Sequence, residues 1–98
     1  MNGTRRQKLA RLLREGPRTV LDLSRVLGTP VKSVLDDLEH VRRGLKEGEE
    51  WTVEDAECLG CGFVFRGRKR LDRPSRCPEC RSEDIREPAY AIGRRVEG

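Results

Sequence analysis

Aromatic residues and long apolar runs are scarce in this sequence. Only 4% of its 98 residues are aromatic, and no apolar run approaches the length that a membrane-spanning helix requires. Because 39% of the residues are charged, a chain this short can bury little apolar surface. The composition argues against a membrane protein and predicts that something besides a hydrophobic core stabilises the fold.

The sequence also lacks a leader-like segment, and its only methionine is the first residue. Without a basic start, an apolar run and a cleavage site, we expect a cytoplasmic protein whose thiols stay reduced. Arginine outnumbers lysine among densely mixed charges, a composition typical of heat-loving organisms. A net charge of +4 and a pI of about 9.2 are compatible with a nucleic-acid partner without establishing one.

Four cysteines form two pairs of identical spacing, with two residues inside each pair and fifteen between the pairs. The four residues are Cys58, Cys61, Cys77 and Cys80. A two-residue spacing allows a tight turn that directs both thiolates at one point, and two such turns complete a tetrahedral shell. Gly62 permits the positive φ that this turn often needs, and Pro78 favours the second turn. The pattern predicts one structural Zn²⁺ per chain.

Other uses of the cysteines stay open at this point. Two disulfides would need an oxidising compartment, or the special case of a hyperthermophile. Iron in a rubredoxin-like site would use the same four ligands, so the spacing does not separate it from zinc. The single histidine, His40, would have to displace a cysteine from a complete shell, and we interpret it as a surface or packing residue.

Helical signals fill the first half of the chain. Thr4 and Gln7 have the spacing of a capping box, and leucines follow at helical intervals. Thr19 is a suitable N-cap for a second helix, with Val20, Leu23, Val26 and Leu27 on one face. Gly28 ends this helix. A third helix over residues 30–43 is expected, with Thr29 as its cap and Pro30 in its first position.

The second half changes to strand-like alternation. Residues 51–57 and 89–92 are the predicted strands, and residues 63–65 are expected to add a strand between the cysteine pairs. Three helices followed by a β-hairpin are typical of a winged helix-turn-helix domain, in which the short Gly-containing turn joins the second and third helices. The expected fold class is therefore α+β.

With these motifs, the sequence resembles a family of small archaeal predicted transcriptional regulators in which a winged helix domain carries a rubredoxin-like zinc ribbon. The specific part of the likeness is the ribbon text from Cys58 to Phe65 and from Pro74 to Cys80; residues 20–43 add the generic helix-turn-helix. The resemblance implies a ribbon inserted in the wing. It divides the chain into a winged helix domain, 1–57 plus 87–98, and a ribbon head, 58–86.

Candidate DNA contacts lie on the third helix and between the cysteine pairs. Residues 31–43 hold three basic and three acidic residues, so this helix is neutral, whereas residues 66–76 carry a net charge of +5. A basic tip can hold phosphates without reading sequence. The alternative is a solvated, solubilising surface. The candidates are Lys32, Ser33, Arg42, Arg43, Arg66, Arg68, Lys69, Arg70, Arg73 and Arg76.

The sequence favours a DNA-binding transcriptional regulator with double-stranded DNA as partner. A zinc-ribbon adaptor of the transcription machinery and an iron-binding electron carrier are the alternatives. A homodimer is a further open possibility. We do not expect an enzyme, because no cysteine is left unclaimed and the sequence has neither a phosphate loop nor a His–carboxylate pairing at motif spacing.

Overall fold

Three helices form the first half of the computed structural model, which describes residues 4–67 and 70–95. Helix α1 spans Arg5–Glu15, α2 spans Val20–Leu27 and α3 spans Val31–Arg43. The predicted capping box begins α1, where the Thr4 hydroxyl accepts from the Gln7 N–H. Thr19 is the predicted N-cap of α2, and its hydroxyl accepts from the Asp22 N–H in a second capping box that was not predicted from the sequence. Each box satisfies amide groups that the first helical turn leaves without partners.

The expected start of the third helix was wrong in its details. Pro30 occupies the N-cap position of α3, which begins at Val31, and no side chain caps the helix. The Thr29 hydroxyl instead donates to the carbonyl of Leu27, and the Thr29 carbonyl accepts from the Ser24 hydroxyl at 2.6 Å. Thr29 therefore stabilises the turn between α2 and α3, while the predicted Gly28 stop is confirmed by its left-handed φ of 60°.

An antiparallel sheet of three strands accompanies the helices, in the order β1–β5–β2. Strand β1 is Arg18–Thr19, β2 is Glu49–Glu54 and β5 is Ala89–Arg94. Trp51 pairs with Ile92, and Arg18 pairs with Tyr90 on the other edge of β5. The sheet thus joins a strand from between the first two helices to strands from both sides of the cysteine region.

The predicted strand over residues 51–57 is divided in the structure. After β2 ends at Glu54, a separate two-residue strand, β3 (Glu57–Cys58), pairs with β4 (Ile85–Arg86). The expected strand at residues 63–65 was also wrong, because only one bridge forms there, between Glu57 and Val64. Backbone hydrogen bonds from the Cys58 N–H to the Phe63 carbonyl, at 2.8 Å, and from the Phe65 N–H to the Ala56 carbonyl, at 2.9 Å, flank this single bridge.

The core lies between the helices and the sheet. Leu9 and Leu13 of α1, Leu23 of α2, and Val34 and Leu38 of α3 have no exposed surface. Tyr90 and Ile92 of β5 pack against them, as does Leu71 from between the cysteine pairs. The helical stripes are confirmed except at Val26, which is 62% exposed, and at Val31, which is 39% exposed. Burying each large side chain stabilises the fold by about 1.5–3 kcal/mol before entropy is counted.

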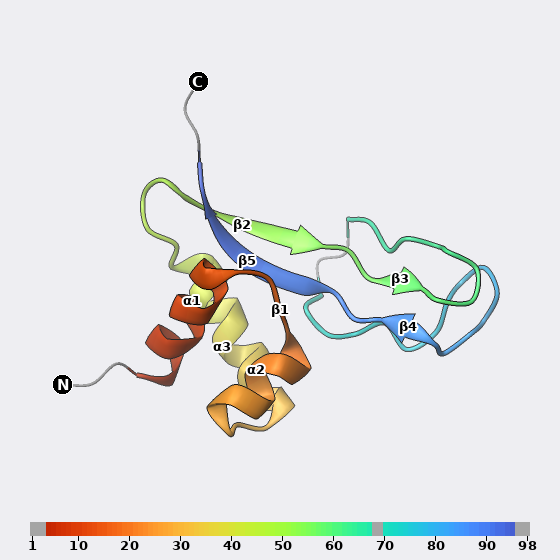
Figure 1. Ribbon diagram of the computed structural model, residues 1–98, viewed down its shortest axis with the longest axis horizontal. Coiled ribbons are helices and arrows are strands. Elements are labelled where there is room, and N and C mark those ends of the chain that lie inside the picture. Colours follow the sequence, from red (N-terminus) through yellow and green to blue (C-terminus); the bar gives the residue numbers. More distant parts are fainter. Residues whose placement is uncertain (1–3, 68–69, 96–98) are drawn as a thin grey trace.

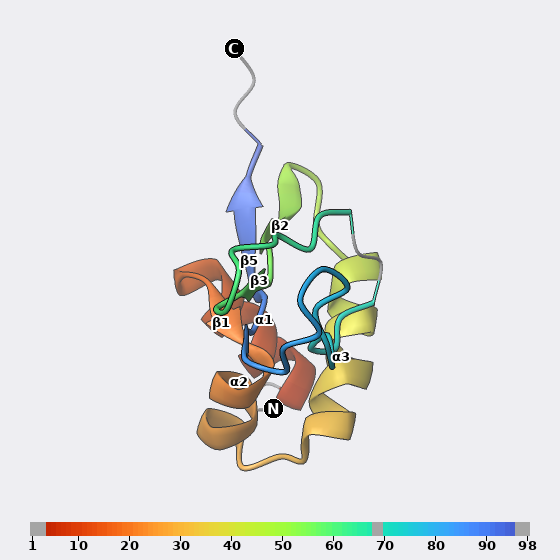
Figure 2. The same cartoon turned by 90° about the vertical axis from the view of Figure 1, so that its right-hand side faces the viewer.

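Figure 1 shows the helices gathered against the sheet and the cysteine region extending beyond the ends of β2 and β5. Figure 2 views the molecule from the side on which this extension faces the reader. We call residues 4–54 with 89–95 the body, and residues 55–88 the head. The fold is mixed α+β. No helix among the described residues is long and apolar enough to cross a membrane.

Candidate metal centre and basic surfaces

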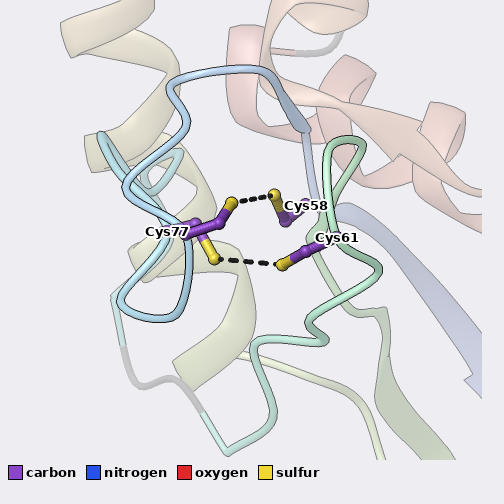
Figure 3. A group of neighbouring side chains, drawn as sticks. Cys58, Cys61 and Cys77 are labelled. Carbon is purple, nitrogen blue, oxygen red and sulfur yellow. Dashed lines mark hydrogen bonds between the residues drawn. The ribbon is translucent and has the colours of Figure 1, made fainter.

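The four cysteine sulfurs converge in the head. They lie within 4.8 Å of one another, with Sγ–Sγ distances of 3.5 Å between Cys58 and Cys80 and 3.6 Å between Cys61 and Cys77. Figure 3 shows Cys58 and Cys61 on one loop, with their side chains directed toward the loop that carries Cys77. Sulfurs around a tetrahedral zinc ion lie about 3.8 Å apart, given Zn–S bonds of about 2.3 Å. The cluster therefore has the dimensions of a four-thiolate metal site.

The two cysteine loops share one backbone design. The Gly62 N–H donates to the Cys58 carbonyl and the Arg81 N–H to the Cys77 carbonyl, each at 2.9 Å. Gly62 and Arg81 each come four residues after the first cysteine of their loop and have positive φ, 82° and 63°. Sequence reasoning found Gly62 but missed Arg81, because nothing in an arginine indicates a left-handed conformation. Each loop thereby brings its two sulfurs to one side.

Exposure differs in the same way within each loop. Cys58 and Cys77, the first cysteines, are buried, while Cys61 and Cys80 are exposed. The Glu79 N–H donates to the Cys77 sulfur at 3.4 Å, a contact that favours negative charge on sulfur. The metal centre consequently lies at the surface, with one half of its ligand set covered by protein.

Protonation of the cluster shows why it suits a cation. Burial raises the pKa of the Cys58 thiol, but N–H donation from Cys61 and Gly60, together with hydrogen bonds from the thiols of Cys80 and Cys61, outweighs burial and brings the pKa to about 7. The Phe63 N–H lowers the pKa of Cys61, yet burial and the neighbouring cysteines raise it to about 12. Without a cation, the crowded sulfurs thus favour a thiolate at Cys58 and disfavour one at Cys61. A divalent ion would offset that repulsion and hold all four deprotonated.

The candidate contacts on α3 differ in how closely Glu39 compensates their charge. Lys32 and Arg43 are exposed, and Ser33 is half-buried. Arg42 donates to both oxygens of Glu39, at 2.7 and 2.9 Å, so its charge is largely compensated. Arg43 lies 3.9 Å from the same Glu39 carboxylate, a longer ion pair than that of Arg42. Lys32 and Arg43 are therefore less compensated than Arg42.

The basic segment between the cysteine pairs is exposed on the head. Arg66, Arg70, Arg73 and Arg76 all face solvent, whereas Arg68 and Lys69 lie outside the described residues. Arg70 pairs with Asp72 at 2.8 Å. Arg70 and Arg42 line the same small hollow beside Trp51, so the basic segment and α3 meet there.

Asp37 corrects the charge count of the third helix. Its side chain is 1% exposed and accepts hydrogen bonds from Arg5 and Arg6 of α1. Burial raises the pKa of Asp37, but the hydrogen bonds and charges of the two arginines outweigh burial and hold it below 3.8. Asp37 thus faces α1, and the exposed side of α3 keeps only two acids, Asp36 and Glu39.

The helical body and the four-cysteine loops define a zinc-ribbon protein of mixed α+β fold. Residues 4–52 match the PF0610-like N-terminal domain, and residues 55–95 match the PF0610 rubredoxin-like zinc β-ribbon domain. The chain belongs to the PF0610-like family. The rubredoxin-like zinc ribbon expected from the sequence is thereby confirmed.

A solved relative supports the same assignment. The solution NMR structure of protein PF0610 from Pyrococcus furiosus is 37% identical, with a TM-score of 0.78. The match covers 97% of this chain and 95% of that chain. No curated protein matches the sequence. The division into domains 1–57 plus 87–98 and 58–86 stays a prediction.

Proposed function

We propose that this protein is a cytoplasmic transcriptional regulator that binds double-stranded DNA through a winged helix-turn-helix domain. The observation that carries the proposal is the path of the chain through the body. Strand β1 follows α1, pairs with one edge of β5 and leads directly into α2. Strands β2 and β5 follow α3 and pair with each other as a hairpin into which the head is inserted. This order of helices and strands is that of winged helix domains, whose third helix enters the major groove.

The exposed charge of α3 supports this role better than the sequence alone did. With Asp37 held by α1, the helix offers Lys32, Arg42 and Arg43 against two exposed or half-exposed acids. Lys32 and Ser33 lie in the first turn, the part of a recognition helix that usually contacts bases. Phosphate repulsion is therefore smaller than a neutral count over residues 31–43 suggested.

The ribbon head would support DNA binding by presenting exposed arginines to the phosphates of the duplex. A closed four-cysteine shell leaves no open position for catalysis at the metal, so the proposed Zn²⁺ is structural and we propose a binding protein in place of an enzyme. Held by Cys58, Cys61, Cys77 and Cys80, the ion would fix the loops that present the exposed arginines. Those arginines are Arg66, Arg70, Arg73 and Arg76. Such contacts position a protein on the duplex without reading its sequence.

Binding to random duplex DNA at several salt concentrations tests the proposal. We expect the affinity to fall steeply with salt, and the Lys32→Gln and Arg43→Gln variants each to reduce the log–log slope by about one. Lys8→Gln removes an exposed charge from α1 and serves as the control. Binding that is undetectable even at low salt, or equal effects of all three variants, would contradict this function.

A specific observation also keeps the adaptor function in view. Leu59 follows the first metal-binding cysteine and is 59% exposed, an apolar side chain at the surface of a charged head. Such a residue suits a contact with a protein of the transcription machinery. If Leu59→Ser abolishes capture of a transcription protein while DNA binding is absent, the adaptor replaces the regulator.

A further inference from the structure

A basic groove lies between α1, the C-terminal end of α3 and the start of β2. We call it the α1–α3 groove; its volume is about 510 Å³. Its basic lining residues are Arg6, Arg11, Arg14, His40 and Lys46, and Glu49 is its one acidic lining residue. A concave surface lined by one sign of charge concentrates ions of the opposite sign.

Only part of this positive charge is compensated within the protein. Arg14 donates to Glu49 at 2.7 Å, and this hydrogen bond with that of the Lys46 N–H lowers the pKa of Glu49 to about 2. Arg6 is held by Asp37 at 3.1 Å. Across the described part of the chain, neither Arg11 nor the Lys46 side chain enters an ion pair. The groove therefore keeps two cations available.

The floor of the groove is apolar. Ala10 of α1, Val41 and Leu45 at the end of α3, and Ile92 of β5 line it. Ala10 is 8% exposed and Ile92 6%, so both belong to the body's core as well. A ligand with an organic part would cover this floor while its charged part meets the basic rim.

The groove continues into a second hollow of about 470 Å³. The two share Arg14, Lys46, Glu49 and Ile92, and the second adds Arg94. The Arg14–Glu49 pair therefore lines both hollows. This continuity gives an elongated anion room for two charged groups, one beside Arg11 and one towards Arg94.

We propose that the α1–α3 groove binds a free phosphate ester on an organic group, of the size and charge of a nucleoside diphosphate. Arginine forks match phosphate oxygens in pairs, and a pocket of this volume falls within the range of small-molecule sites. The groove lies at the opposite end of α3 from Lys32, roughly 18 Å along the helix axis. The inference does not depend on DNA binding.

Titration of the ¹⁵N-labelled, metal-loaded full chain with adenosine diphosphate tests the proposal by NMR. We expect saturable shifts of the Arg11 and Arg14 side-chain Nε signals and of the amides of residues 44–46. The Arg11→Gln/Lys46→Gln double variant should weaken binding at least about tenfold, since it removes two charge-assisted contacts. Both side chains are exposed, so the fold should persist, and an unchanged amide spectrum away from the groove checks this.

The matched control is the Lys8→Gln/Arg25→Gln double variant, which removes the same charge from exposed positions outside the groove. It should bind adenosine diphosphate within about twofold of the parent. Equal losses in both double variants would show general charge attraction and overturn the site. Absence of saturable shifts at the groove would do the same.

Two further probes identify what the groove recognises. Inorganic pyrophosphate should bind several-fold more weakly than adenosine diphosphate, because it leaves the apolar floor uncovered; equal affinity would overturn the organic part of the proposal. Short duplex DNA should leave the Arg11 signal in place. If duplex DNA displaces the nucleotide and shifts the same signals, the groove serves the nucleic-acid backbone and a free ligand is the wrong assignment.

Discussion

The body and the head reach a stable structure by different means. In the body, five aliphatic side chains from three helices have no exposed surface, and two capping boxes fix helix ends. Among the residues of the head that the structure describes, seven are buried. Leu71 packs into the body's core, and the others are Ala56, Cys58, Pro74, Cys77, Ile85 and Pro88. So few apolar contacts cannot order a segment of this length. Packing therefore stabilises the body, whereas we expect metal coordination by the four cysteines to stabilise the head.

A side chain of the head, that of Leu71, packs into the core of the body. Leu71 comes from between the cysteine pairs, yet it is 6% exposed and packs in the body's core. Its carbonyl accepts from the Tyr90 hydroxyl of β5 at 2.8 Å. The head is therefore attached to the body by a side chain and a hydrogen bond as well as by β2 and β5. We therefore expect a loss of structure in one region to affect the other mainly through Leu71.

Removing the metal should have the largest effect. Structural zinc in small domains contributes about 10–16 kcal/mol of apparent binding energy, so chelation should unfold the head. We expect amide signals of residues 57–65 and 77–86 to collapse to random-coil positions, while those of α1, α2 and α3 stay dispersed. Heteronuclear NMR before and after chelation measures this.

Metal analysis of the purified protein completes this experiment. One zinc ion per chain in a colourless protein would exclude the electron carrier, whereas a red protein would identify iron in the same thiolate site. Head signals that stay dispersed without metal would show that the cysteines do not organise this region. Loss of the helix signals together with the head would show that the body depends on it.

Truncating a core side chain should destabilise the body and leave the metal site of the head intact. Leu13 has no exposed surface, so Leu13→Ala should lower the free energy of unfolding by about 2–5 kcal/mol. The metal should stay bound, because its four ligands lie in the head whereas Leu13 lies in the core of the body. Leu59→Ala, at a site 59% exposed, is the control and should change stability by less than about 0.5 kcal/mol. Chemical denaturation, with helix unfolding and zinc release followed by separate signals, distinguishes unfolding of the body from unfolding of the head. If both signals change at the same denaturant concentration, body and head are a single cooperative unit.

Much of this arrangement could be predicted from local sequence signals. Capping residues, leucine spacing and Gly28 gave the three helices, and the cysteine spacing gave the metal cluster, because each depends on residues a few positions apart. Long-range contacts were missed. From the sequence, Asp37 resembles any other surface acid, because its partners on α1 are about thirty residues away. Leu71 likewise lies within a basic segment, and only the folded structure shows that it packs in the core of the body.

The strand errors have the same origin. Alternation over residues 51–57 suggested one continuous strand, but the chain leaves the sheet after Glu54 to enter the head and pairs again only at Glu57. Where a strand ends depends on its partner: β5 begins at Ala89, opposite Glu54. The point at which β5 begins is a property of the folded sheet, and no local pattern in the sequence of β2 encodes it.

Asp37 allows a smaller and sharper test within the body. Asp37→Asn removes a buried carboxylate that holds two arginines, and we expect a loss of about 1–3 kcal/mol near neutral pH. Because the folded pKa lies below the ordinary 3.8, the stabilisation is complete above pH 3.8. It should disappear as the pH falls through the folded pKa.

Asp36→Asn is the matched control for Asp37→Asn. It removes the same charge one residue earlier on α3, from an exposed position, and should change stability by less than about 0.5 kcal/mol. Urea denaturation of both variants from pH 7 down to pH 3 measures the difference. Equal effects of the two substitutions would show that general charge, and not the contact with α1, accounts for the stabilisation.

The smallest expected effect is the most specific for the connection between the regions. Tyr90→Phe keeps the ring, which stacks on Trp51 with centroids 5.5 Å apart, but removes the hydroxyl that donates to Leu71. One hydrogen bond contributes about 0.5–1.5 kcal/mol, so global stability should fall only slightly. Relaxation measurements should show faster motion of residues 70–72 relative to the body, with the metal still bound. If their mobility and hydrogen exchange are unchanged, Leu71 is held by apolar packing alone, and the hydroxyl contributes nothing to the coupling of head and body.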